Sequence, residues 1–100
     1  MDGHKIRQLN IVNNAIHEFE NGFVSLGSLI STMEAILPIV DDPSFGDAIF
    51  PQLVALEEVN ARLGEGNFDF DRYGRPVIDK AVNAIKECVH GLIDHRRPIE

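Results

Sequence analysis

The sequence predicts an all-α protein, an antiparallel four-helix bundle that forms a single helical domain over residues 1–100. Apolar residues recur every three or four positions in four separate stretches, which is the spacing of one face of an α-helix. No stretch of alternating residues has a second strand to pair with. Two short connections and one of about ten residues join the four stretches, and connections of these lengths favour antiparallel neighbours. With 44% hydrophobic residues, the chain has enough apolar surface for one core.

The first two helices are expected over residues 3–20 and from Leu26 onward. The first stripe is Leu9, Val12, Ile16 and Phe19. Asn21 and Gly22 supply its stop signal, and Ser25 is a typical N-cap for the second helix. The second stripe is Leu26, Leu29, Ile30, Met33, Ile36, Leu37 and Val40. Because Pro38 lies within this stripe, the helix should kink there or end near Ile36.

The third helix should follow the turn at residues 41–44 and continue almost to Gly64. Its stripe is Phe45, Ile49, Leu53, Leu56, Asn60 and Leu63. Pro51 interrupts the hydrogen-bond ladder, so a kink or a late start is expected.

The fourth helix should begin near Pro76, because proline is tolerated in the first turn. Its stripe is Ile78, Ala81, Val82, Ile85, Val89 and Leu92. The segment 67–73, "NFDFDRY", alternates rings and charges but has no partner strand. We expect it to be an ordered loop.

The charge distribution excludes several functions. The formal net charge is −7, from 16 acidic and 9 basic residues, which opposes binding to nucleic acid. No Lys or Arg occurs from Gln8 to Ala61. The acids of that segment are Glu18, Glu20, Glu34, Asp41, Asp42, Asp47, Glu57 and Glu58. No apolar run is long enough to span a membrane, no signal peptide is evident, and the single Cys88 cannot form an internal disulfide. A cytoplasmic protein without membrane contact is expected.

In an up-down-up-down bundle, the first and third connections meet at one end, and the second connection lies at the other end. We call the end with the 21–25 and 63–74 connections the loop pole. The candidate partner-binding residues there are Glu18, Glu20, Glu57, Glu58, Phe68, Asp69, Phe70, Asp71 and Tyr73. Acids that steer a partner and rings that anchor it would suit a basic protein. Alternatively, the acids form a solvated face, the rings cap the core, and Arg62, Arg72 and Arg75 brace the loop through its own carboxylates.

No group of residues has the spacing of a catalytic or metal site. The four histidines form no HExxH or HxH pattern: His4, His17, His90 and His95. Segment 67–78 superficially resembles a calcium loop, but Arg72 and Ile78 stand where an EF-hand requires Gly and Glu. The glycines of 64–66 follow a helix rather than a strand, so they form no phosphate cradle. We expect no enzymatic activity, no metal and no cofactor.

The order and spacing of the segments resemble small four-helix immunity proteins of bacterial toxin systems. The segments are "HEF", "SLGSLISTMEAIL", "LVALEEVNARL", "GEGNFDFDRYGRP" and "VIDKAVNAIKECV", within residues 9–93. The similarity is to immunity proteins of the colicin D type and of contact-dependent growth inhibition.

This resemblance implies a monomer that binds a cognate toxin, often a nuclease, one to one. Acidic residues would then cover the toxin's cationic cleft, with Glu57, Glu58, Asp69 and Asp71 first and Glu18 and Glu20 beside them. The alternative function is a helical adaptor or regulatory module, for which a dimer is expected.

Overall fold

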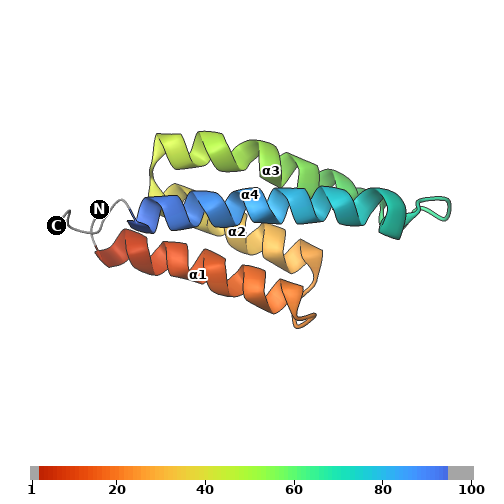
Figure 1. Ribbon diagram of the computed structural model, residues 1–100, viewed down its shortest axis with the longest axis horizontal. Helices are drawn as coiled ribbons and strands as arrows, with labels where there is room; N and C mark the ends of the chain where they lie inside the picture. Colours follow the sequence, from red (N-terminus) through yellow and green to blue (C-terminus); the bar gives the residue numbers. More distant parts are fainter. Residues whose placement is uncertain (1–2, 95–100) are drawn as a thin grey trace.

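The computed structural model describes residues 3–94, without the side chains of His4 and Asp94, and confirms the four-helix bundle (Figure 1). The helices are α1 (Gly3–Glu20), α2 (Leu26–Val40), α3 (Pro43–Arg62) and α4 (Arg75–Asp94). A short helical turn, η1 (Phe70–Gly74), precedes α4. Within residues 3–94, no helix is both long enough and apolar enough to cross a membrane.

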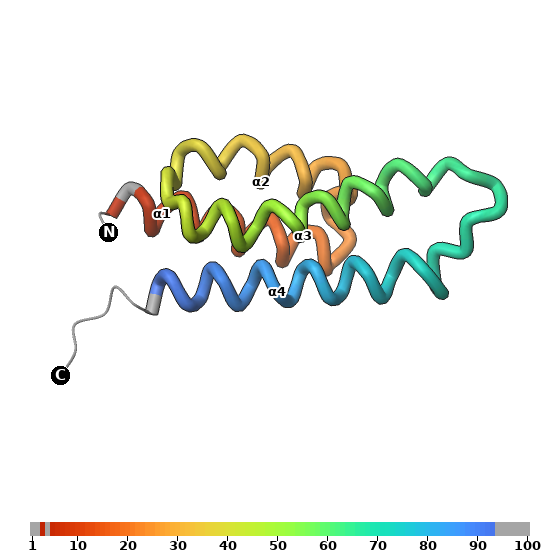
Figure 2. The backbone as a smooth tube through the Cα atoms, turned by 90° about the horizontal axis from the view of Figure 1, so that it is seen from above, coloured from red at the N-terminus to blue at the C-terminus, as the bar shows by residue number. Residues whose placement is uncertain are grey.

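The helices run alternately up and down, and each packs against two neighbours. α1 contacts α2 and α4, and α3 contacts the same two helices. The bundle is elongated, with extents of 53 × 25 × 24 Å. Figure 2 shows that the α3–α4 pair extends well beyond the turn between α1 and α2. The two connections of the loop pole therefore lie at different heights along the bundle.

Side-chain caps fix where α2 and α3 begin. The Ser25 hydroxyl accepts a hydrogen bond from the Ser28 N–H at 3.1 Å, as expected of an N-cap. Asp42 accepts one from the Phe45 N–H at 3.0 Å, and Pro43 occupies the first position of α3. Asp41 ends α2 in the left-handed conformation, with φ of 51°. The turn between these helices is thus only two residues long.

Neither internal proline ends or delays its helix. The expected end near Ile36 is wrong, because α2 continues through Pro38 to Val40. A late start of α3 is also wrong, because that helix begins at Pro43 and contains Pro51. Both prolines are exposed. The carbonyl groups that lose an N–H partner lie on the solvent side, where water replaces the bond at low cost.

The core consists of the apolar stripes of all four helices, with one correction in α3. Twenty described hydrophobic residues are buried, including the expected Phe45, Ile49, Leu53 and Leu56. Asn60 and Leu63, predicted to face inward, are exposed. Val59 is buried instead, so the buried face of α3 continues from Leu56 by a step of three residues and turns towards α4.

Residues 70–74 are helical, so the expectation of an ordered loop is wrong for them. The Asp69 carboxylate accepts a hydrogen bond from the Arg72 N–H at 3.2 Å and caps η1. The Tyr73 N–H donates to the Asp69 carbonyl at 2.9 Å. Short-range hydrogen bonds of Asp69 therefore override the alternating pattern, and η1 runs directly into α4.

Candidate partner-binding surfaces

Two of the three rings at the loop pole cap the core. Phe68 and Phe70 are half-buried and pack against the core cluster. Both rings lie over Gly74, where an added Cβ would come within 2.9 Å of the Phe70 ring and 3.2 Å of the Phe68 ring. Gly74 is buried and lets the rings approach the backbone. Tyr73, by contrast, is 58% exposed. Of the three rings, it is the one most available to a partner.

Of the three arginines expected to brace the loop through its own carboxylates, only Arg75 does so among the described residues, whereas Arg62 pairs within α3 and Arg72 contacts a ring. Arg62 pairs with Glu58 at 3.9 Å, and Arg75 pairs with Asp71 at 3.8 Å. The Arg75 guanidinium also lies 5.7 Å from the centre of the Phe70 ring. Arg72 lies 5.5 Å from the centre of the Tyr73 ring. These ion pairs are long and exposed, so each stabilises the fold by no more than about 1 kcal/mol.

Two of the candidate acids have structural roles. Asp69 caps η1 through its side chain. Glu20 on α1 accepts a hydrogen bond from the Lys86 ammonium group on α4 at 2.6 Å, and this contact joins two neighbouring helices. Glu18 is exposed, and it has no ion-pair partner among the described residues. The acidic surface at the loop pole is therefore smaller than the sequence suggests.

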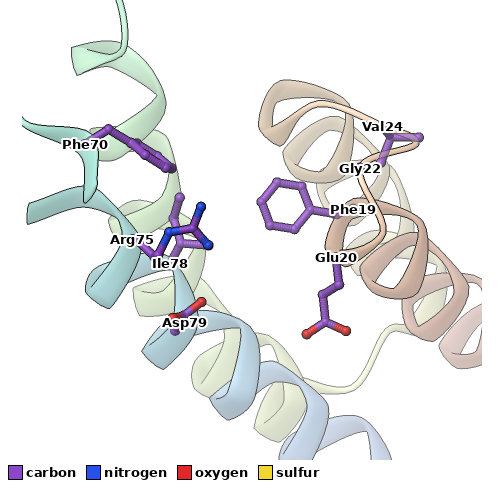
Figure 3. A pocket seen from close by; sticks show the side chains of 8 residues that line it. All are labelled: Phe19, Glu20, Gly22, Val24, Phe70, Arg75, Ile78 and Asp79. Carbon is purple, nitrogen blue, oxygen red and sulfur yellow. The ribbon is translucent and has the colours of Figure 1, made fainter. Parts of the chain in front are cut away.

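The staggered helix ends place the candidate residues on different sides of the molecule. Glu20 and Phe70 line one cleft of about 420 Å³ between the α1–α2 turn and the start of α4. Figure 3 shows Phe19 and Glu20 on one side of this cleft, with Arg75 and Asp79 on the other.

A second groove, of about 300 Å³, lies between α3 and α4. Three of the candidate residues line it: Glu58, Phe68 and Tyr73. The nine candidates therefore do not converge on one surface.

Glu57 lies on a third side, next to α2. The neighbouring carboxyl group of Glu34 raises the pKa of Glu57 above the ordinary value of 4.5, first through side-chain hydrogen bonding and then, after desolvation, through its charge. Neither carboxyl group has a basic partner among the described residues. From the sequence, Glu34 is recognised only as one of the acids between Gln8 and Ala61. The available signal for this pair was that Glu34 lies outside the apolar stripe of α2 and Glu57 lies outside that of α3.

Phe50 and Val54 are exposed apolar residues that the sequence analysis did not single out. Phe50 is 64% exposed and Val54 is 43% exposed. Both lie outside the apolar stripe of α3, which is the feature that could have marked them. They occur on the same helix as Glu57, seven and three residues before it.

The titratable side chains of Cys88 and His90, on α4, line neither the cleft nor the groove described above. Residues 3–94 contain no group of three or more His, Cys, Asp or Glu side chains arranged to hold a metal ion. The amide group of Asn13 lies 3.4 Å from the Nε2 atom of His90. Partial burial raises the pKa of Cys88, with the nearby Glu87 charge adding to this, so the thiol stays protonated at neutral pH. The side chain of His4 and all of His95 lie outside the described part of the chain.

No protein-family model, curated protein or solved structure matches this chain. The resemblance to immunity proteins stays a prediction from the sequence segments given above. Function is therefore inferred from the exposure, charge and contacts of the chain's own residues.

Proposed function

We propose that the protein is an immunity protein, which binds a cognate bacterial toxin and neutralises it by covering a cationic active-site cleft. A nuclease is the class of toxin that fits best, because its cleft must be cationic to hold phosphate groups. Inhibition of this kind requires exclusion of the substrate and no catalysis by the inhibitor.

The observation that carries this proposal is the charge of the first three helices. From Gln8 to Ala61 the chain has eight acids and no Lys or Arg. Within this region, Glu34 and Glu57 face each other across α2 and α3. Like charges held together destabilise a fold, so such a pair is unexpected on a surface that serves only solubility. A cationic partner would convert this repulsion into attraction.

The ion pairs at the loop pole are compatible with the proposal. Glu58 and Asp71 are bound to their arginines only at 3.8–3.9 Å and in solvent. Such pairs are weak, so these carboxylates still contribute to the negative field that an approaching partner meets. Electrostatic steering of this kind speeds the encounter of oppositely charged proteins.

The test is inhibition of the toxin by purified protein. We expect a toxin domain to be encoded immediately upstream of this chain, and its nuclease activity to fall to background at one equivalent of the protein. Undiminished activity with several equivalents, or an upstream gene without a toxin domain, would show that the proposal is wrong.

Sedimentation distinguishes the adaptor function from the immunity function. An immunity protein is expected to sediment as a monomer when free and as a one-to-one complex with the toxin. A stable dimer that leaves the nuclease active would support the adaptor instead.

A further inference from the structure

The exposed apolar residues of α3 lie on the same side of the helix as Glu57. Phe50, Val54 and Glu57 are spaced by four and three positions, so they form one stripe along α3. This stripe lies on the α2 side, because the side chain of Asn60, three residues after Glu57, lies 3.8 Å from where a Cβ on Gly27 of α2 would be, and Glu57 is next to Glu34 of α2. We call the surface formed by Glu34, Phe50, Val54 and Glu57 the α2–α3 face.

This face combines an apolar part with an unneutralised negative charge. Phe50 is 64% exposed, more than any other described large hydrophobic residue except Phe23 in the α1–α2 turn. The two carboxyl groups have no basic partner among residues 3–94. The basic residue of α3, Arg62, pairs instead with Glu58, which lines the groove on the α4 side.

We propose that the α2–α3 face is the docking surface for a basic segment of the partner protein. A Lys or Arg of that segment lies between Glu34 and Glu57, and its apolar side chains cover Phe50 and Val54. This inference rests on the proposed function for the partner's identity, and it places the main contact away from the loop pole.

Charge complementarity selects this occupant over a second copy of the chain. A copy docked through the same face would bring another Glu34–Glu57 pair against the first, and each molecule carries a net charge of −7. A basic segment instead separates the two carboxylates with a cation. The exposed Phe50 ring, seven residues before Glu57 along the same helix, provides the apolar area that an anchor of an interface requires.

The loop pole is the weaker candidate by the same criteria. Glu20 is bound to Lys86, Asp69 caps η1, and Phe68 and Phe70 are packed on the core. A partner there would compete with contacts that stabilise the fold. On the α2–α3 face, a partner removes a repulsion that the free protein contains.

The experiment uses the full chain labelled with ¹⁵N and a synthetic amphipathic helical peptide of Leu and Lys. Backbone amide shifts locate the peptide. Phe50→Ala and Glu57→Gln test the face, and Phe23→Ala and Glu58→Gln are matched controls. Phe23 is the more exposed ring, and Glu58 is the adjacent acid on the other side of α3. All four positions are exposed, and a melting curve checks that each variant is folded.

We expect the shifts to concentrate at residues 31–38 and 50–57. Phe50→Ala and Glu57→Gln should each raise the Kd on the order of tenfold, whereas each control should change it by less than about twofold. Four results would overturn the inference: shifts centred on residues 68–79, shifts spread over the acids of all four helices, equal effects of the tests and their controls, or no binding.

The same four variants separate this inference from the proposed function. If the wild-type chain inhibits the upstream toxin and all four variants inhibit equally well, the toxin docks elsewhere and only the inference fails. If the peptide docks on the α2–α3 face but the toxin is not inhibited, the docking surface stands and the immunity function fails.

Discussion

Glu57 and Glu58 are neighbours in the chain, but their carboxyl groups have opposite surroundings. Glu57 meets another acid, Glu34, whereas Glu58 pairs with Arg62. The two residues also lie on different sides of α3. A charge count of the sequence treats them alike, and only the packing of α2 against α3 separates a repelled carboxylate from a paired one.

This difference predicts how stability depends on pH. The folded state holds a proton on Glu57 more tightly than the unfolded chain does, so the stabilisation from that proton is fully present below pH 4.5. It is lost as the pH rises through the raised pKa, when Glu57 and Glu34 are both charged. Glu57→Gln removes this repulsion and should raise Tm at pH 7, with a smaller gain near pH 4. Thermal melting from pH 4 to 7 measures the effect.

Glu58→Gln is the control for that measurement. It removes only a long, exposed ion pair, so Tm should change little at either pH. A Glu57→Gln protein that melts at or below the wild-type temperature at pH 7 would mean that the two carboxyl groups do not repel each other.

Gly74 is the second residue whose effect can be measured separately. Gly74→Ala places a methyl group within 2.9–3.2 Å of the Phe68 and Phe70 rings, so both rings must shift. We expect this to lower the free energy of unfolding by about 1–3 kcal/mol, as is typical of overpacking. Denaturant unfolding checks it.

Gly91→Ala is the matched control within α4. An added Cβ there meets no atom within 4 Å, and the helical backbone favours alanine by about 0.5–1 kcal/mol. Gly91→Ala should therefore stabilise the protein. If Gly74→Ala also stabilised it, the Phe68 and Phe70 rings would not be held over residue 74.

At the scale of the helices, the caps distinguish structural acids from acids available to a partner. Asp42 is half-buried and holds the first turn of α3 through the Phe45 N–H. Asp42→Ala should cost about 1 kcal/mol of stability, whereas Asp42→Asn, which retains an accepting oxygen, should cost little.

Chemical denaturation of the two Asp42 variants makes this comparison. Neither should weaken binding of the basic peptide by more than about twofold, since Asp42 lies outside the α2–α3 face. Equal losses of stability in both variants would show that the Asp42 oxygen is not the cap.

The sequence predicts most of the helices because the buried faces repeat with helical spacing. The four stripes, the Ser25 cap and the first-turn Pro76 follow from local rules. The errors occur where local rules compete. Val59 takes the place of Asn60 in the core. The buried face of a helix can continue with a step of three or of four residues, and the local pattern does not decide between them. η1 forms because Asp69 supplies a cap that an alternating pattern conceals.

The candidate site is less predictable, because it depends on how far each helix extends past its neighbour. The sequence groups the acids of the loop pole on the assumption that the helix ends are level. In the structure, α3 and α4 extend past the α1–α2 turn (Figure 2). Glu20 therefore meets Lys86, and Glu57 meets Glu34. No spacing within one helix contains this information.

For the whole molecule, the important property is that many acidic residues lie in a part of the chain that contains no basic residues. After its first residues, α1 contains no Lys or Arg. The same is true of all of α2 and of α3 as far as Ala61. Nearly all ion pairs of the described residues therefore involve the 62–86 region. The surface of α2 and α3 is left to attract an external cation.

The rate at which the protein associates with the upstream toxin domain tests the central claim most directly. Electrostatic steering of an acidic inhibitor towards a cationic cleft predicts that the association rate constant, measured by stopped flow, falls by at least about tenfold as salt rises from low to high concentration. An association rate that does not change with salt would contradict the claim that acidic charge guides this protein to its partner.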